Sequence, residues 1–408
     1  MRVLIVGSGG REHALAWKLS ASSTLSELHA APGTPGIAAL GVCHPVRAED
    51  GEGLLALARA LDIDLAVIGP EAPLVAGVAD ELRHAGVAVF GPVAGAARIE
   101  GSKSFAKDVM QAAGVPTAAR LPVARTPCVV KADGLAAGKG VFVCRSREEL
   151  DHALQSAANL GGPVVIEELL EGEELSVFAI ADGANTLTLA AARDFKRAGD
   201  GDTGPNTGGM GSFSPVPEVG ADEVAEIVET VHAPVLAELA RRRTPFTGVL
   251  YAGLMLTEDG PRVLEFNCRF GDPETQSVLP RIDGDLLEAL AAAAAGDLRG
   301  IALGESAGAA VTVVVAASGY PEQGDTGTPI EGLAAAEQEG ALVFQSGTAL
   351  RGTTLVTSGG RIVGVTGLGE DLRAARAAAY RAAAHVSFEG ARYRSDIAQA
   401  AAETARVG

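Results

Sequence analysis

The sequence predicts an α/β region followed by α+β regions, and three features of its 408 residues indicate this fold class. Short apolar strands alternate with helical segments in the first hundred residues, which is typical of a doubly wound parallel sheet. The middle of the chain has strands on either side of glycine-rich stretches, which favours a larger mixed sheet. The last hundred residues have new strands followed by an alanine-rich helix, which indicates an α+β domain. Because the chain is too long for one hydrophobic core, we expect domains at 1–100, 101–307 and 308–408.

The individual elements follow from the hydrophobic pattern. Strands are predicted where apolar runs end at turn residues, and helices where alanine-rich or helically spaced segments follow a start signal. The strands are expected at 3–6, 65–68, 87–90, 128–131, 141–144, 164–167, 187–192, 248–256, 262–266, 311–315, 342–345 and 362–367. The helices are expected at 12–20, 103–113, 147–158, 289–295 and 371–385.

Composition and charge exclude several functional classes. The chain has 33 Lys and Arg against 51 Asp and Glu, a formal net charge of −18, which argues against nucleic acid or an anionic membrane as partner. No stretch approaches a membrane-spanning run, and the N-terminus lacks the cleavage site of a signal peptide, so we expect a cytoplasmic protein. The four cysteines have no CxxC spacing, which favours reduced thiols in the core over zinc or disulfides.

Residues 193–213 form the most informative segment of the chain. They include six glycines, three aspartates and the cations Arg193, Lys196 and Arg197. Glycine loses the most conformational entropy on ordering, so packing does not explain such a segment. We expect a loop that closes over a charged ligand and offers its cations to phosphate oxygens. A disordered surface linker is the alternative.

The turn after the first strand reads GSGGRE and opens a helix. Its amides and the helix dipole can hold an anion, and we expect a phosphate-bearing substrate there. A redox dinucleotide is a weaker alternative, because Glu12 stands where the third glycine of GxGxxG belongs and no acidic residue closes the next strand. A tight turn without any ligand is the other alternative.

A second glycine-rich motif runs from Lys131 to Val141. It differs from a P-loop because its spacing is one residue short, no Ser or Thr follows Lys139, and a strand rather than a helix comes next. The motif therefore predicts a mobile glycine hairpin between two strands. Such a hairpin can fold over nucleotide phosphates, with Lys131 as a point charge. A plain structural hairpin is the alternative.

A third motif, VIEELLEGEE, ends the strand predicted at 164–167. Two carboxylates followed by two leucines suit the hinge of a nucleotide pocket, where backbone groups read adenine and a carboxylate accepts from ribose hydroxyls. A solvated acidic turn is an equally good interpretation of these residues alone.

The fourth motif is VLEFNCRFGDPET. Strand alternation places Glu265, Asn267 and Arg269 on one face, opposite Leu264, Phe266 and Cys268. Carboxylate and amide oxygens are ligands that Mg²⁺ accepts alongside substrate phosphates. The alternative is a strand whose outer face is merely polar.

In this order, the motifs resemble those of the phosphoribosylamine-glycine ligase family of the ATP-grasp superfamily. The resemblance is carried by GSGGREHALA, GPEAPLVAGV, GPVAGAARIEGSK, VVKADGLAAGKGV, EELLEGEE, KRAGDGDTGPNTGGMG and LEFNCRFGDPETQ, and covers nearly the whole chain. It implies an ATP-grasp fold with an N-terminal doubly wound domain, a small lid subdomain at about 117–175 and a C-terminal α+β domain. It also implies a monomer that ligates glycine to 5-phosphoribosylamine through a glycyl phosphate in purine synthesis, with ATP and Mg²⁺ or Mn²⁺.

The resemblance also implies roles for individual residues. Lys103 and Lys131 are expected to bind nucleotide phosphates, residues 167–170 to form the adenine hinge, and Glu174 to bind ribose. The full set of nucleotide contacts is Lys103, Lys131, Gly138, Lys139, Gly140, Glu167, Glu168, Leu169, Leu170, Glu174, Arg197 and Asn206. The implied metal ligands are Glu265 and Asn267, the substrate contacts are Gly9, Gly10, Glu71, Asp194, Arg269 and Asp272, and the catalytic residues are Lys131, Arg197 and Arg269. Of the substrate contacts, Gly9, Gly10 and Glu71 are assigned to phosphoribosylamine and Arg269 to the glycine carboxylate.

The chain departs from the ligase pattern at two places and from the wider ATP-grasp pattern at a third. The stretch from Pro116 to Lys131 is short, which implies that one helix of the lid is missing, and Phe195 stands where a polar residue such as His is expected. The strand around 251–255 lacks a carboxylate that many ATP-grasp enzymes use for metal, and the ligase family shares this absence. Two rival functions are a related ATP-grasp carboxylase or formate-dependent transformylase, which would not carry GDTGPNTGGMG, and a nucleotide-binding regulatory protein with an inactive site.

Overall fold

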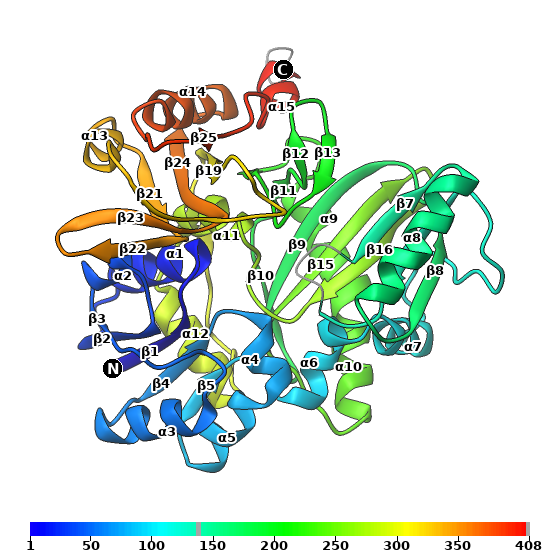
Figure 1. The fold of residues 1–408 in the computed structure, drawn as a ribbon. Coiled ribbons are helices and arrows are strands. Elements are labelled where there is room, and N and C mark those ends of the chain that lie inside the picture. The colour runs from blue at the N-terminus through cyan, green and yellow to red at the C-terminus, as the bar shows by residue number, and fades with distance from the viewer. Residues whose placement is uncertain (136–139, 405–408) are drawn as a thin grey trace.

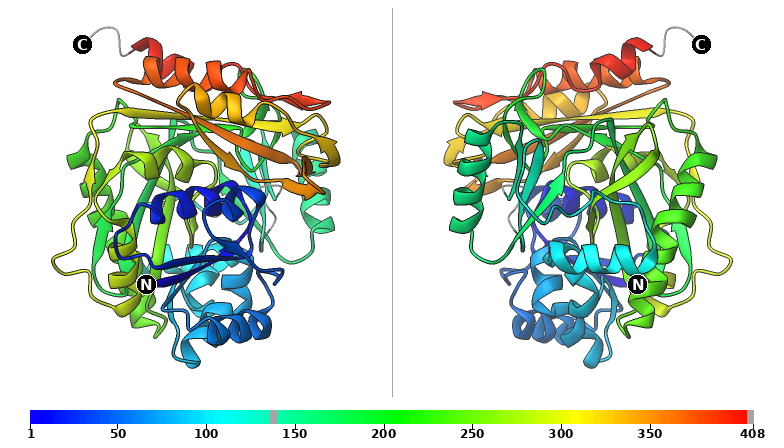
Figure 2. Two further views of the ribbon diagram at one scale, coloured as in Figure 1. Left: turned by 90° about the vertical axis from the view of Figure 1, so that its left-hand side faces the viewer. Right: turned by 90° about the vertical axis from the view of Figure 1, so that its right-hand side faces the viewer.

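The structure, a computed structural model, describes residues 1–135 and 140–404. In Figure 1 the N-terminal region (blue) lies below the C-terminal region (orange and red), and the middle of the chain (green) extends away from both. Figure 2 shows the same stacking from two sides, with α14 (Leu372–Ala383) on the outer surface of the C-terminal region.

The N-terminal region is the doubly wound sheet that the sequence predicts. Its strand order is β3-β2-β1-β4-β5 and every neighbouring pair is parallel. On β1, Leu4 and Val6 pack into one core cluster and Val3 and Ile5 into another, so both faces of the sheet are covered. The strands are β1 (Arg2–Gly7), β2 (Glu27–Pro32), β3 (Val42–Cys43), β4 (Leu65–Ile68) and β5 (Ala88–Phe90), and the helices are α1 (Gly10–Leu19), α2 (Pro35–Ala38), α3 (Gly51–Ala60), α4 (Glu71–Ala76), α5 (Val78–His84) and α6 (Ala94–Gly101).

The central sheet has the order β10-β9-β15-β16 and is antiparallel throughout, so the prediction of a mixed sheet is wrong. Its strands are β9 (Glu173–Asp182), β10 (Thr186–Thr188), β15 (Thr247–Thr257) and β16 (Gly260–Asn267). Strand β9 was not predicted, because its first residues belong to the acidic motif. The predicted strand at 187–192 is also shorter than expected, since β10 ends at Thr188.

Helices cover this sheet on one face and part of the other. Leu175 and Val177 of β9 share a cluster with Val231 and Val235, whereas Phe178 on the opposite face packs with the helix α12. These helical segments are α7 (Lys103–Ala113), α9 (Ala221–Ile227), the π-helical turn η1 (Val228–His232), α10 (Ala233–Arg241), α11 (Glu274–Val278), the 3-10 turn η2 (Leu279–Arg281) and α12 (Leu286–Ala295). A short pair, β17 (Ile282–Asp283) and β18 (Gly304–Glu305), leads to the C-terminal region.

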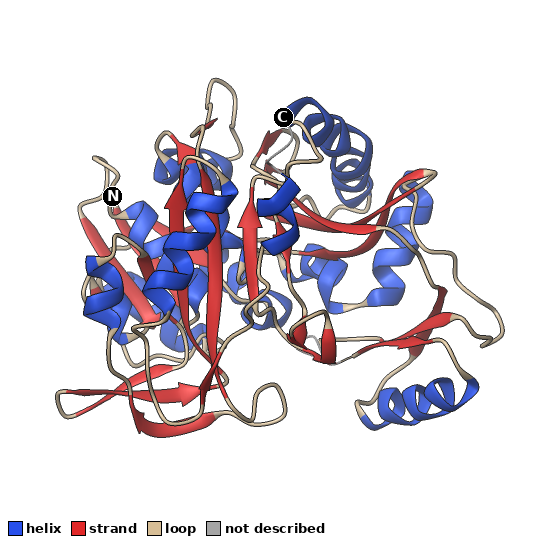
Figure 3. Ribbon diagram, turned by 90° about the horizontal axis from the view of Figure 1, so that it is seen from above, coloured by secondary structure: helices blue, strands red, loops and turns tan. Residues whose placement is uncertain are grey.

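A three-stranded antiparallel sheet forms the lid, with the order β7-β6-β8 and one helix (Figure 3). It comprises β6 (Cys128–Ala132), β7 (Val141–Cys144), α8 (Arg147–Asn159) and β8 (Val164–Glu168). Its interior is a separate cluster that includes Cys128, Val130 and Leu150. The predicted pairing of strands on both sides of the glycine motif is confirmed, since Lys131 is registered with Val141.

The C-terminal region has a sheet of order β11-β14-β19-β24-β21, with β25 on β19, and a second sheet of order β20-β23-β22. Strands β11 and β14 come from the segment that was predicted to be a loop, and β14 pairs with β19. The elements are β11 (Arg193–Asp194), β12 (Arg197–Gly199), β13 (Thr203–Asn206), β14 (Gly211–Ser214), β19 (Ala309–Ala317), β20 (Asp325–Pro329), α13 (Leu333–Gln338), β21 (Leu342–Gln345), β22 (Thr348–Arg351), β23 (Thr354–Gly359), β24 (Arg361–Gly369), α14, β25 (Ala391–Arg392) and α15 (Gln399–Thr404). The domain boundaries near 100 and 308 stay a proposal. Strand β14 precedes the second boundary in the sequence but pairs with β19, which follows it.

Among the residues that the structure describes, no helix combines the length and the apolar character needed to cross a membrane.

Candidate active site

A cleft with a volume of about 1370 Å³ lies where the N-terminal region, the lid, the central sheet and the C-terminal region meet. Nearly all of the predicted site residues line it: Glu71, Lys103, Lys131, Gly140, Glu167, Glu168, Leu169, Leu170, Glu174, Asp194, Arg197, Asn206, Glu265, Asn267, Arg269 and Asp272. Gly138 and Lys139 lie outside the described residues. Gly9 and Gly10 are not among the residues that line the cleft.

Lys131 reaches the cleft from β6 and is held there by a buried carboxylate. Its Nζ lies 2.8 Å from Oε2 of Glu167 and donates to the backbone carbonyl of Leu264 at 2.8 Å. Glu167 is only 1% exposed. It also forms an ion pair with Lys107, whose Nζ lies 2.9 Å from Oε1, although the angles at this contact are not those of a hydrogen bond. Burial lowers the pKa of Lys107 to about 8, although the carboxylate of Glu167 opposes this shift. One carboxylate therefore holds two lysines.

The acidic pair at the predicted hinge already has protein partners. Glu167 faces the lysines, and Glu168 accepts from the amide of Ala119 at 2.8 Å and from the guanidinium of Arg262. The Ala119 hydrogen bond, more than the Arg262 charge, lowers the pKa of Glu168. Leu169 and Leu170 follow at the wall of the cleft. The side chains available to an adenine ring are thus the two leucines rather than the two carboxylates.

Beside the hinge, Lys196 joins two carboxylates of the cleft. Its Nζ lies 2.5 Å from Oε2 of Glu174 and 2.7 Å from Oδ1 of Asp194. Burial raises the pKa of Asp194 to about 7, against the opposing charge of Lys196. Burial alone would lower the pKa of Lys196, but the carboxylates of Asp194 and Glu174 outweigh it and raise that pKa. Lys196, which was predicted to be offered to phosphate oxygens, is thus paired with two of the protein's own carboxylates in this structure.

The segment predicted as a loop that closes over a ligand contains a short hairpin, which is held by the C-terminal segment. Strands β12 and β13 pair, with Arg197 opposite Asn206. Arg394, whose side chain is 1% exposed, donates to the carbonyl of Arg197 at 3.1 Å and to Oδ1 of Asp202 at 2.8 Å. Its guanidinium also lies 4.9 Å from the ring of Phe195, so the unexpected aromatic residue has a packing partner. Asn206 donates to the carbonyl of Val141, which joins the hairpin to the lid.

Glu265 and Asn267 lie at the end of β16 and both face the cleft. Strand alternation was wrong for Leu264, which lines the cleft together with Glu265 although it was predicted to lie on the opposite face. The register of β15 and β16 skips Leu264, and this bulge puts Val263 and Phe266 in the core and Glu265 in the cleft.

These two residues suit a divalent ion that is bound mainly by phosphates. Within 1–135 and 140–404, no group of three or more His, Cys, Asp or Glu side chains could hold a metal ion alone. Glu265 and Asn267 supply two hard oxygen donors, and Lys103 Nζ lies 3.6 Å from Oε2 of Glu265. Burial raises the pKa of Glu265, but Lys103 and Lys131 outweigh it and keep that pKa below its ordinary value. The carboxylate is therefore ionised at neutral pH, as a metal ligand must be.

Arg269 is held between two carboxylates of the N-terminal region. Its Nη2 lies 2.9 Å from Oε1 of Glu100 and its Nε lies 3.2 Å from Oε2 of Glu71. Burial raises the pKa of Glu71, but the charges of Arg269 and Arg11 outweigh it and lower the pKa to about 2. Glu100 is 5% exposed, and burial raises its pKa. Arg269 thus links the N-terminal region to the floor of the cleft.

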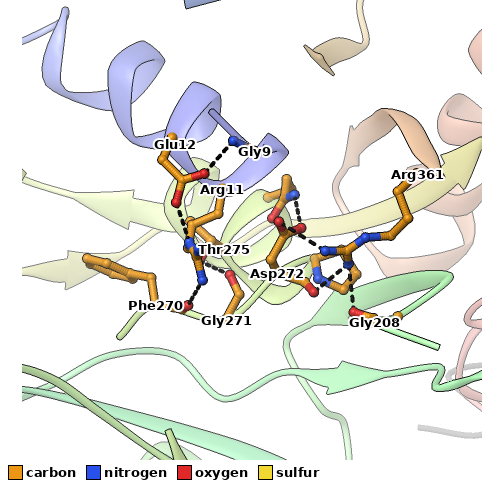
Figure 4. A network of polar contacts seen from close by, with 12 residues as sticks. Gly9, Arg11, Glu12, Gly208, Phe270, Gly271, Asp272, Thr275 and Arg361 are labelled. Carbon is orange, nitrogen blue, oxygen red and sulfur yellow. Dashed lines mark hydrogen bonds and ion pairs between the residues drawn. The ribbon is translucent and has the colours of Figure 1, made fainter. Parts of the chain in front are cut away.

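The turn at the start of α1 is occupied by its own glutamate (Figure 4). Glu12 accepts from the amide of Gly9 at 2.5 Å and from Nε of Arg11 at 2.6 Å. A Cβ on Gly9 would lie 3.3 Å from Oδ2 of Asp272, which shows how closely the turn approaches that carboxylate. A bound anion would have to compete with Glu12 for the amide of Gly9, and the sequence did not predict this contact.

Sequence reasoning missed three residues that hold the site together: Lys107, Glu100 and Arg361. Lys107 follows Lys103 by four residues on α7, and this helical spacing was a usable signal. Glu100 lies within the motif GPVAGAARIEGSK, which was used only for the resemblance, and Arg361 is an isolated charge with no local pattern around it.

Comparisons with known proteins agree with this architecture. The chain matches the three family models of phosphoribosylglycinamide synthetase, the N domain over residues 1–100, the ATP-grasp (A) domain over 101–275 and the C domain over 310–400. It is 51% identical to the phosphoribosylamine–glycine ligase of Streptomyces coelicolor, covering 98% of this chain and 100% of that one. It is 45% identical to the trifunctional purine biosynthetic protein adenosine-3 of Gallus gallus, covering 97% of this chain and 42% of that protein.

Solved structures give the same result. The crystal structure of phosphoribosylamine–glycine ligase from Thermotoga maritima superposes with a TM-score of 0.84 at 37% identity, covering 97% of this chain and 100% of that one. Biotin carboxylase from Campylobacter jejuni shares the fold, with a TM-score of 0.71 at 14% identity and coverage of 96% and 92%. The chain therefore belongs to the phosphoribosylglycinamide synthetase family of ATP-grasp ligases, which bind ATP with a divalent metal ion and join glycine to phosphoribosylamine in purine biosynthesis.

Proposed function

We propose that the ligation runs through a glycyl phosphate formed in the cleft described above. A carboxylate oxygen of glycine attacks the γ-phosphorus of ATP, and ADP leaves. The amine of phosphoribosylamine then attacks the acyl carbon, a C–N bond forms, and phosphate departs with the carboxylate oxygen. Both steps collect negative charge on phosphoryl oxygens, so positioning and cations supply most of the catalysis.

The proposal assigns roles by position. Lys131 and Lys103 bind nucleotide phosphates, Leu169 and Leu170 contact the adenine, and Glu174 binds the ribose. Arg197 and Asn206, opposite each other on the hairpin, contact the nucleotide from the other side of the cleft. Gly138, Lys139 and Gly140 of the glycine hairpin, with Glu167 and Glu168 behind the lysines and the hinge, complete the nucleotide site.

The remaining predicted residues are assigned to the acceptor substrates. Arg269 binds the glycine carboxylate, and Glu71, Asp194 and Asp272 contact the substrates. Gly9 and Gly10 approach phosphoribosylamine from the turn above Asp272. A divalent ion, Mg²⁺ or Mn²⁺, held by Glu265 and Asn267 would neutralise charge on the transferred phosphoryl group. We further propose that the protein is a cytoplasmic monomer that binds neither nucleic acid nor membrane.

What supports this assignment is that five residues from three separate motifs line one cleft: Lys131, Arg197, Glu265, Asn267 and Arg269. A regulatory protein with an inactive site would not need phosphate-binding cations, hard metal ligands and a guanidinium for a carboxylate together.

An oxygen-18 experiment tests the intermediate. Glycine labelled in its carboxylate is expected to place a single heavy oxygen in the released phosphate, because that oxygen leaves with the γ-phosphoryl group when the amine attacks. Mass spectrometry of phosphate and of glycinamide ribonucleotide from the same reaction measures the transfer. Labelled water with unlabelled glycine is the control for simple ATP hydrolysis. Light phosphate formed together with the product would exclude the acyl phosphate.

A further inference from the structure

Arg361, the first residue of β24, connects the C-terminal region to two segments of the cleft (Figure 4). Its Nη1 donates to the carbonyl oxygens of Gly208 and Asp272, each at 2.6 Å. Its Nη2 lies 3.2 Å from the Oδ2 atom of Asp272. The side chain is 20% exposed, so these contacts are largely removed from water.

The hydrogen bond from Arg361 to Gly208 fixes the loop that follows the β12–β13 hairpin. The amide of Gly208 donates to the hydroxyl of Tyr320 at 2.8 Å, so both backbone groups of this residue are held by the C-terminal region. A Cβ on Gly208 would lie 3.1 Å from that hydroxyl and 3.3 Å from Cζ of Arg361. The loop therefore fits closely against the two side chains, two residues after Asn206.

The ion pair between Arg361 and Asp272 affects the ionisation of the Asp272 carboxyl group. Burial raises the pKa of Asp272, but the charges of Arg361, Arg11 and Arg269 together outweigh it and lower that pKa, and Arg361 contributes the most of the three. Gln276 Nε2 donates to Oδ1 of Asp272 at 2.8 Å and lowers the pKa as well. The ionisable or polar groups that face Asp272 or its partners are Arg361 from β24, Arg11 and Glu12 from α1, Arg269, Glu274 and Gln276 from the motif and α11, and Tyr320.

Three acceptors of the protein surround the guanidinium of Arg361. Nη1 serves two backbone carbonyls and Nη2 serves a carboxylate. A planar guanidinium can hold three acceptors in fixed directions in this way, whereas an ammonium group cannot.

We propose that Arg361 is a positioning residue of the ligase, which orients the Asp272 carboxylate and fixes the Gly208 loop beside it. The inference rests on the substrate-binding role proposed for Asp272. It makes the C-terminal region part of the active site, because one side chain of β24 holds both Asp272 and the Gly208 loop in place.

Kinetics of Arg361→Met against pH test this inference. The kcat/KM for freshly generated phosphoribosylamine is expected to fall by about 10- to 100-fold, the range for loss of hydrogen bonds to a charged group. The acid limb of the pH profile should move to higher pH by about one unit or more, because removing an adjacent cation raises the pKa of a carboxylate. All variants use the same substrate, so its own ionisation cancels in the comparison.

Three further variants separate the roles. Arg361→Lys should restore the acid limb but recover only part of the rate, because lysine keeps the charge without the fork of donors. Tyr320→Phe is the matched control for the loop: it removes the acceptor of Gly208 and should lower the rate without moving the acid limb. Asp272→Asn combined with Arg361→Met should lose less than the product of the two single losses, because the share of the Arg361 effect that acts through the Asp272 carboxylate is already gone.

The outcomes distinguish the inference from the function on which it rests. An acid limb that stays in place in Arg361→Met, or an Arg361 effect that is fully additive to Asp272→Asn, overturns the positioning role. A normal KM for phosphoribosylamine in Asp272→Asn instead removes the proposed role of Asp272. Absence of ADP release by the wild-type protein with glycine and phosphoribosylamine would contradict the ligase function itself.

Discussion

Glu265→Gln is expected to abolish detectable turnover at ordinary Mg²⁺ concentrations while the protein stays folded. The carboxylate is ionised and lies beside Asn267, so glutamine removes the charge that the proposed metal site needs while it keeps the size and one oxygen. Loss of one group that stabilises transition-state charge costs about 100- to 1,000-fold in rate, and loss of a metal ligand adds to this. Steady-state ADP release, measured across a Mg²⁺ titration, gives the result.

The fold should tolerate this change because the side chain of Glu265 is 31% exposed and its ion-pair contact to Lys103 is long, at 3.6 Å. An ion pair of this kind contributes about 0–1 kcal/mol to the free energy of unfolding. Glu322→Gln is the matched control, since Glu322 is an exposed carboxylate that lines the same cleft. Near-normal activity of Glu265→Gln at unchanged Mg²⁺ would show that the metal is bound elsewhere.

Local sequence patterns predicted the elements that carry the site. The helix at 103–113 and the strand at 65–68 have the predicted bounds, and the lid strands pair across the glycine motif as expected. These elements depend on short-range signals, namely apolar periodicity, a cap residue and a glycine stop. Ser102, for example, caps α7 by accepting from the amide of Phe105.

Long-range contacts account for most of what could not be predicted. The segment 193–213 has the composition of a loop, yet Phe213 pairs with Val311 and Arg193 pairs with Phe213. The strand partner stands about a hundred residues away, and the cation that holds the hairpin, Arg394, is further still. Composition cannot report such partners, because the same residues would be a flexible loop without them.

In the site, too, local patterns identified some residues, whereas long-range contacts decide the position of others. Residues that stand together in a motif, such as Glu265, Asn267 and Arg269, were identified as a group. The predicted hinge carboxylate Glu167 instead faces inward, because it is the counter-charge of two lysines from other elements. Electrostatic balance in a buried cluster is a property of the fold, and no local pattern encodes it.

Lys131→Met is expected to lower kcat/KM by about 100- to 1,000-fold, the loss that follows removal of one charge-stabilising donor. The ammonium group lines the cleft and is fixed by Glu167 and by the carbonyl of Leu264, so it is oriented before any ligand binds. The measurement is ADP release at saturating glycine, together with the affinity for ATP.

Stability must be separated from catalysis in this variant, because Glu167 loses one of its two cations and breaking a buried pair costs about 3–5 kcal/mol. Lys107→Met is the matched control: it removes the other partner of the same carboxylate, but Lys107 is not among the residues that line the cleft. Urea unfolding should show both variants destabilised, whereas only Lys131→Met should lose most of its activity well below the unfolding transition. Equal loss of activity in the two variants would mean that Lys131 acts through the packing of Glu167, and that phosphate is bound by another cation of the cleft.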